Sequence, residues 1–163
     1  MTTNITTITS LTSKDEAEWK NLFLAYHEYY QIQPDEKVIS TTFARILSEK
    51  EPVFGSLARD ENGEAIGFVH WVTHRSTLAV NDYIYLHDLF VNESVRSRGT
   101  GRKLIEHVYE DADKIEAARV YWQTKVSILD ELERYKENNT HTLVLPPIFY
   151  ISARQSSSSI TLR

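Results

Sequence analysis

The residues best suited to chemistry lie in one short basic turn, from Arg96 to Arg102, with the sequence Arg-Ser-Arg-Gly-Thr-Gly-Arg. Its two glycines let a ligand approach the backbone closely, and its three arginines supply positive charge. An apolar stretch ends at Val91 before the turn, and residues with helical spacing begin at Leu104. Backbone N–H groups and the positive end of a helix dipole meet at such a turn, so the sequence predicts an anion site that fits a pyrophosphate.

Two common phosphate-binding loops do not fit this turn. The nucleoside-triphosphate loop continues as Gly-Lys-Ser or Gly-Lys-Thr, whereas here Gly101 is followed by Arg102. The dinucleotide fingerprint needs a third glycine, which is missing. A tight basic turn without any ligand shares the Gly-x-Gly pattern, so on these residues alone both interpretations stay open.

The elements that would position this turn follow from hydrophobic spacing. We expect strands near residues 5–8, 53–59, 65–74, 83–91, 120–124, 142–145 and 148–152. We expect helices over about 16–32, before residue 49, after residue 102 and over 127–137, the first of them opened by a capping box between Ser13 and Glu16. This order predicts an α/β chain of the α+β, sandwich-like kind: one mixed, mostly antiparallel sheet with helices on both faces.

Composition narrows the function classes. The 163 residues suit one domain, which we place at 1–154, with a serine-rich and disordered tail at 155–163. No cysteine is present, which excludes a disulfide, a thiol nucleophile and a cysteine-bound metal. The net charge of −5 argues against general nucleic-acid binding. Without an evident signal peptide or a membrane-spanning run, we expect a cytoplasmic protein that also has access to the nucleus and does not bind a membrane.

The basic turn in its context resembles a known loop. Arg-x-x-Gly-x-Gly after Leu-Phe-Val and before Lys-Leu-Ile is similar to the coenzyme A pyrophosphate loop of the GNAT superfamily of N-acetyltransferases. The strands over 67–86 resemble the polyamine-acetyltransferase branch. The stretches 109–114 and 120–124 resemble the fungal branch that acetylates histones, polyamines or D-amino acids.

The resemblance implies the GNAT-type acyl-CoA N-acyltransferase fold, acetyl-CoA as co-substrate and no metal. It implies that the end of the 83–91 strand hydrogen-bonds the acetyl carbonyl and the pantetheine arm, with the Val91 N–H polarising the thioester oxygen. The residues it assigns to the coenzyme are Leu89, Phe90, Val91, Arg96, Ser97, Arg98, Gly99, Thr100, Gly101 and Arg102.

Two residues are candidates for proton transfer. His87 stands where the polyamine branch has a glutamate that relays the amine proton through water, and a histidine can do this near neutral pH. Its alternative role is that of a half-buried strand residue. Tyr135 stands at the place of the family's tyrosine that protonates the leaving thiolate. Its alternative role is packing under the sheet.

Three further residues are candidates for substrate binding. Strand alternation predicts that Asp88 points to the face opposite His87, in a structural or an amine-steering role. His27 and Tyr29 lie where family members place a substrate-facing loop, while the stripe of Tyr26 and Tyr30 is typical of core.

The resemblance weakens after Thr124. Where the family has an asparagine and then an Arg-Ala pair, this chain has Ile128, Asp130 and Glu131. The function implied is acetyl transfer to a primary amine, with a small amine such as a polyamine or an amino acid favoured, through a ternary complex in a homodimer. The alternatives are an acyl-CoA-binding domain without turnover and a protein or histone lysine acetyltransferase.

Overall fold

The computed structural model describes residues 6–95, 99–123 and 150–153. In chain order the elements are β1 (Thr7–Ser10), the short 3-10 helix η1 (Ser13–Asp15), α1 (Glu16–Tyr29), α2 (Glu36–Ile46), β2 (Val53–Arg59), β3 (Ala65–His74), β4 (Tyr83–Val91), the 3-10 helix η2 (Glu93–Val95), α3 (Thr100–Lys114), β5 (Arg119–Gln123) and β6 (Tyr150–Ala153). The central strands β2, β3 and β4 occupy the predicted ranges. The predictions for β1 and β5 are displaced by two residues and one residue.

The strands form one sheet in the order β1-β2-β3-β4-β5-β6. Neighbouring strands are antiparallel except β4 and β5, which are parallel. Two parallel neighbours need a crossover connection, and α3 supplies it. The predicted mixed and mostly antiparallel sheet is therefore confirmed.

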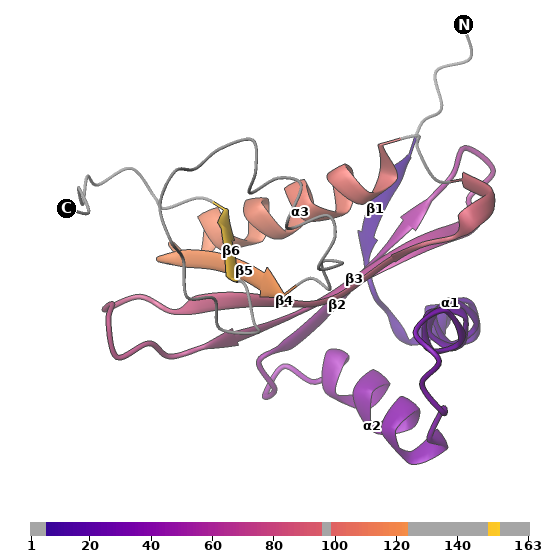
Figure 1. The fold of residues 1–163 in the computed structure, drawn as a ribbon, viewed down its shortest axis with the longest axis horizontal. Coiled ribbons are helices and arrows are strands. Elements are labelled where there is room, and N and C mark those ends of the chain that lie inside the picture. Colours follow the sequence, from indigo (N-terminus) through magenta and orange to yellow (C-terminus); the bar gives the residue numbers. More distant parts are fainter. Residues whose placement is uncertain (1–5, 96–98, 124–149, 154–163) are drawn as a thin grey trace, which may run out of the picture.

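Helices cover both faces of the sheet, as predicted. Figure 1 shows α1 and α2 on one face and α3 on the other. Alternation along β3 divides the core accordingly: Phe68 packs with the α1 side, and Val69 and Trp71 pack with the α3 side. The side chain of His70, 3% exposed, also points to the α1 side, where its ring lies 5.8 Å from that of Trp19.

The start of α1 differs from the prediction. The carboxylate of Asp15 accepts hydrogen bonds from the Thr12 backbone N–H at 2.8 Å and from the Thr12 hydroxyl at 2.6 Å. The capping interaction therefore lies one residue before the predicted pair of Ser13 and Glu16, and η1 precedes the helix. At the other end of the chain, the predicted helix over 127–137, the strand over 142–145 and the tail lie outside the described residues. The predicted strand over 148–152 overlaps β6.

Candidate active site

The basic turn leads into the N-terminus of α3. Gly99 caps this helix with a φ of 80°, in the left-handed region that glycine adopts without strain. The next residue, Thr100, is 2% exposed. Its hydroxyl is the one buried side-chain polar atom among the described residues that has no hydrogen-bond partner. A buried hydroxyl at the positive end of a 15-residue helix fits an anionic or strongly polar ligand.

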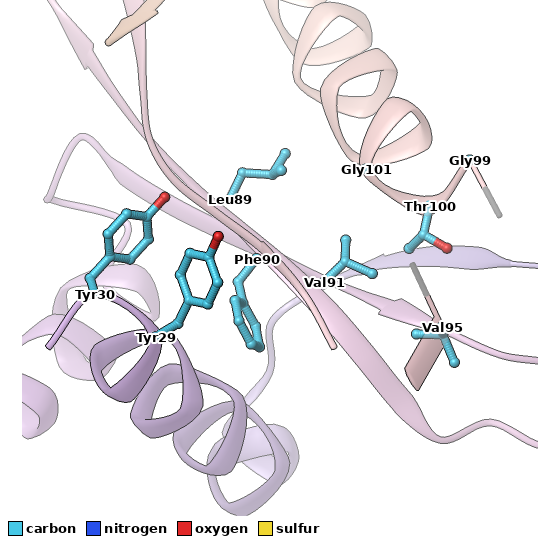
Figure 2. Close-up of a pocket in the computed structure, with 9 residues that line it drawn as sticks. All are labelled: Tyr29, Tyr30, Leu89, Phe90, Val91, Val95, Gly99, Thr100 and Gly101. Carbon is cyan, nitrogen blue, oxygen red and sulfur yellow. The ribbon is translucent and has the colours of Figure 1, made fainter. Parts of the chain in front are cut away.

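A cavity of about 420 Å³ opens beside this helix terminus. Figure 2 shows that the end of β4 runs through it, between the last turn of α1 and the first turn of α3. Leu89 and Val91 point toward α3, and Phe90 points toward α1. The cavity is lined by Tyr29, Tyr30, Leu89, Phe90, Val91, Val95, Gly99, Thr100 and Gly101.

The cavity has the chemistry that acetyl-CoA requires. Thr100 and the N-terminus of α3 can hold a pyrophosphate, and the apolar side chains of Leu89 and Val91 can lie along the pantetheine arm. A Cβ added at Gly101 would lie 3.8 Å from Leu89 and 3.9 Å from Val91, which are ordinary van der Waals distances, so Gly101 borders the cavity without a steric need for glycine. Of the other residues assigned to the coenzyme, Arg102 is exposed on α3 and residues 96–98 lie outside the described part.

The edge of β4 that enters the cavity extends beyond its pairing with β5. Tyr83 to Leu86 pair with Arg119 to Trp122, and the register with β5 ends there. The same strand pairs with β3 as far as Val91. Among the described residues, the second half of β4 thus pairs with β3 alone, and α3 packs across one face of the sheet (Figure 1).

A bulge in β4 sets the orientation of its two polar residues. His70 pairs with Asp88 and Trp71 pairs with Leu86, so His87 is the extra residue on β4. A bulge interrupts strict alternation. The Asp88 carboxylate accepts a hydrogen bond from His87 Nδ1 at 3.1 Å, and the His87 ring lies 5.4 Å from that of Tyr85. The prediction that Asp88 points to the face opposite His87 is therefore wrong.

Asp88 lies at the centre of a hydrogen-bonded cluster. Besides His87, its carboxylate accepts from Tyr26 Oη at 2.8 Å and from His70 Nδ1 at 3.0 Å. His70 in turn accepts from Trp19 Nε1 at 2.8 Å. Asp88 is 12% exposed, whereas the His87 side chain is 58% exposed, so His87 forms the outer end of the cluster.

The cluster changes the acidity of its members. Burial on its own raises the pKa of Asp88, but the hydrogen bonds from His70 and His87 outweigh it and hold that pKa well below its ordinary value. The hydrogen bond to Asp88 raises the pKa of His87, while burial lowers the pKa of His70. Burial and the charge of Asp88 together raise the pKa of the Tyr26 phenol. The only neutral-pH titration that this arrangement favours is that of His87.

The other predicted site residues fall into three groups. Tyr29 lines the cavity, and so does Tyr30, which was expected in the core but is 38% exposed. His27 is 7% exposed, packs against Phe23 and hydrogen-bonds the Phe23 carbonyl oxygen at 2.7 Å, so it does not reach the cavity. Tyr135 lies outside the described residues.

Sequence reasoning missed the inner half of the cluster. Neither His70 nor Trp19 was among the candidate site residues. The available signal was a histidine inside the apolar run of β3, since a buried imidazole needs a partner. Within the described ranges, no group of acidic and histidine side chains is arranged to hold a metal ion, and no helix is long and apolar enough to cross a bilayer.

Comparison with known proteins identifies the relatives of this chain. Residues 16–137 match the profile of the acetyltransferase (GNAT) family. The D-amino-acid N-acetyltransferase HPA3 of Saccharomyces cerevisiae is 39% identical over 118 residues, which cover 72% of this chain and 73% of that protein.

Solved structures agree on the fold. A probable acetyltransferase superposes with a TM-score of 0.68 at 22% identity, covering 86% of this chain and 98% of the other. AAC(6')-Iy in complex with the bisubstrate analogue CoA-S-monomethyl-acetylneamine superposes with a TM-score of 0.64 at 16% identity, covering 87% and 97%. At these identities the structural likeness concerns the fold, which is that of acyl-CoA N-acyltransferases.

Proposed function

The chain belongs to the acetyltransferase (GNAT) family and is an acetyl-CoA-dependent N-acetyltransferase, and from this premise we propose that it acetylates a small primary amine by direct attack in a ternary complex. The observation that carries the proposal is the pair of His87 and Asp88 on β4, directly before the strand enters the cavity. An exposed imidazole held by a buried carboxylate is suited to accept a proton near neutral pH.

The proton acceptor is His87 Nε2. Since Nδ1 donates to the Asp88 carboxylate, the neutral ring carries its lone pair on Nε2. An amine reaches the enzyme mainly as an ammonium ion, which is not nucleophilic. One proton passes from the ammonium nitrogen to Nε2, directly or through one water, and leaves a neutral amine.

The bond changes then balance without another reagent. The amine nitrogen forms a bond to the acetyl carbon, the carbon–sulfur bond breaks, and the electron pair leaves with the thiolate of coenzyme A. The nitrogen loses its second proton, the thiolate gains one, and His87 returns its own proton to water. We assign the polarisation of the thioester oxygen to the Val91 N–H and the protonation of the thiolate to Tyr135, both by resemblance to the family.

The acceptor in this proposal is cationic and small, and one observation supports each property. The chain carries a net charge of −5, and the buried anion Asp88 lies behind the proposed base, so the field around the site favours cations. The yeast relative is named for acetylating D-amino acids. We place polyamines and amino acids of either hand in the acceptor class, with Tyr29 at the cavity wall as a contact.

The test is release of free thiol from acetyl-CoA with a panel of amines: a polyamine, D- and L-amino acids, and a lysine-containing histone-tail peptide. We expect kcat/KM for a small amine to exceed that for the peptide. With the best amine, His87→Gln should lower kcat by roughly 10²- to 10⁴-fold, the range for a general base. His107→Gln is the matched control and should retain activity, because His107 lies on α3 and forms a hydrogen bond with Ser56 away from the Asp88 cluster.

Other outcomes would assign a different function. Preference for the peptide by more than tenfold would indicate a protein lysine acetyltransferase, because that ratio corresponds to about 1.4 kcal/mol in transition-state binding. Calorimetric binding of acetyl-CoA without thiol release would indicate a binding domain that has lost turnover. Full activity in His87→Gln would remove His87 from the mechanism.

The role of Tyr135 is tested separately. Tyr135→Phe keeps the ring and removes the proton donor, so kcat should fall by roughly tenfold to a thousandfold while the dissociation constant of acetyl-CoA stays within a few-fold. A phenylalanine variant that turns over at the parent rate would show that Tyr135 only packs.

A further inference from the structure

Behind the proposed base lies a row of buried groups that a general base alone does not require. Trp19, on α1, is fully buried between Phe23 and Phe43, with ring centroids 5.0 and 4.9 Å away. Its indole nitrogen lies 2.8 Å from Nε2 of His70, which is 3% exposed on β3. This hydrogen bond joins α1 to β3 deep in the core, and its two residues are 51 positions apart in the sequence.

This contact fixes the protonation state of His70. An indole N–H can only donate a hydrogen bond, so His70 Nε2 must accept it. The proton of His70 is then on Nδ1, which faces the Asp88 carboxylate at 3.0 Å. A second proton on Nε2 would point at the indole N–H, so the geometry excludes the imidazolium form.

The hydrogen-bond donors around Asp88 likewise fix its ionisation state. Its carboxylate has three neighbours that all donate: Tyr26 Oη, His70 Nδ1 and His87 Nδ1. An ionised carboxylate accepts all three bonds, whereas a protonated one would bring its own hydrogen against a donor. Asp88 therefore carries one negative charge, and the two neutral donors Tyr26 and His70 do not balance it.

We propose that Trp19 and His70 are positioning residues: the indole N–H holds His70 as the neutral Nδ1–H tautomer, so that Asp88 remains an anion that His70 does not neutralise and whose charge acts on His87. The proposal rests on the function proposed for His87. It deepens that function because it explains how one buried carboxylate both orients His87 and keeps its Nε2 available as the proton acceptor.

The titratable groups around the cluster are few within the described residues. On β4, Asp88 and Tyr85 flank His87; on β3 the neighbour is His70; on α1 they are Tyr26 and Tyr30. Tyrosine side chains ordinarily ionise only at about pH 10, and burial together with the charge of Asp88 raises the pKa of Tyr26 further. Of these groups, His87 is therefore the one that can change its charge near neutral pH. His70 can do so only if its indole partner is removed.

Nitrogen NMR of the histidines tests the proposal directly in the intact protein without substrates. We expect His70 to be the neutral Nδ1–H tautomer and not to titrate between about pH 5 and 9. We expect His87 to titrate with a pKa above its ordinary value, because of Asp88. A His70 that carries its proton on Nε2, or that titrates in the same range as His87, would overturn the proposal.

A substitution tests the role of the indole. In Trp19→Phe, His70 Nε2 loses its donor and can take up a proton, and the resulting cation competes with His87 for Asp88. The pKa of His87 should fall by about one pH unit, and the acid limb of the kcat/KM profile should move by the same amount. An unchanged pKa of His87 would overturn the proposal.

Two further variants separate this effect from a damaged core. Trp71→Phe removes a similarly buried indole on the α3 side and should lower stability without moving the pKa of His87. In the double variant Trp19→Phe/His70→Asn, the asparagine amide can still donate to Asp88 but cannot become charged, so the pKa of His87 should return to the parent value. Failure of this rescue would also contradict the proposal.

The proposed function and the proposed role of Trp19 and His70 can be disproved independently of each other. The NMR measurements need no turnover, so a protein that acetylated no amine while showing these tautomers would disprove the function and support the positioning of His87. If Trp19→Phe does not fold, the tautomer of His70 in the parent protein decides alone.

Discussion

The two ends of the site, the Asp88 cluster and the N-terminus of α3, differ in whether their buried polar groups have hydrogen-bond partners. Around Asp88, each buried polar atom has a partner, from the indole of Trp19 outward to His87. At the N-terminus of α3, the buried hydroxyl of Thr100 has none within the described residues. An unpaired buried group costs about 1–3 kcal/mol, which a ligand can recover. The α3 end is therefore suited to binding, and the Asp88 end to holding a proton acceptor in place.

The largest effect on activity is expected from a substitution in the Asp88 cluster, where the buried polar groups have hydrogen-bond partners. Asp88→Asn removes the charge and turns an amide toward three donors, so His87 loses both its anchor and its raised pKa. We expect kcat/KM to fall by roughly 10²- to 10⁴-fold, as for other carboxylates that orient a catalytic histidine. Urea unfolding should show a loss of about 1–3 kcal/mol, because donors are left unpaired.

The dissociation constant of acetyl-CoA is the control for Asp88→Asn, because the cavity residues at α3 are untouched. Calorimetry should give a value within a few-fold of the parent. A large loss of coenzyme affinity would show that the two ends are not independent and that the comparison is wrong.

The next effect concerns the binding end. Gly101→Asp places a negative charge beside the site that we assign to the pyrophosphate, and the dissociation constant of acetyl-CoA should rise by roughly a hundredfold or more. Gly101→Ala is the matched control: its Cβ meets only ordinary contacts at 3.8 and 3.9 Å and favours the helix. It should preserve the fold and weaken binding much less. Equal affinity in the parent and Gly101→Asp would move the pyrophosphate elsewhere.

Local sequence was enough to predict much of this fold. The ranges of β2 and β3 matched because apolar alternation and the turn around Gly63 are short-range signals. The helix that follows the basic turn was predicted for the same reason, since the two glycines and the residues with helical spacing are neighbours in the chain, while the binding of an anion there stays a prediction. These features need no knowledge of which strand pairs with which.

The Asp88 cluster could not be predicted in that way. The bulge at His87 arises from the register of β4 against β3, and alternation alone therefore placed Asp88 on the wrong face. The bond from Trp19 to His70 joins residues 51 positions apart, and no local pattern indicates it. Tyr30 was assigned to the core because helical spacing shows a stripe but not where the helix ends beside a cavity.

A smaller effect is expected at the unpaired hydroxyl. Thr100→Val has nearly the same shape and removes the hydroxyl that has no partner. Its unfolding free energy should stay equal or rise by about 1 kcal/mol, while the dissociation constant of acetyl-CoA rises by roughly tenfold. Thr100→Ser, which keeps the hydroxyl, is the control and should bind like the parent. If Thr100→Val both binds normally and unfolds more easily, the hydroxyl has a structural partner and no ligand.

The smallest expected effect is a pH dependence of stability that arises from the Asp88 cluster and not from the N-terminus of α3. Because Asp88 raises the pKa of His87 in the folded protein, the proton on His87 stabilises the fold. That contribution is fully present below the unfolded pKa of about 6.5 and is lost as the pH rises through the higher folded pKa. Asp88 has the opposite sign: its lowered pKa contributes stability above about pH 4, which is lost as the pH falls toward its folded value.

Urea unfolding between pH 6 and 8.5 should therefore show the parent losing slightly more stability than His87→Gln, whereas Thr100→Val should follow the parent at every pH. Parallel curves for the parent and His87→Gln would mean that Asp88 does not hold the proton of His87, and the contrast between the two ends of the site would then rest on binding alone.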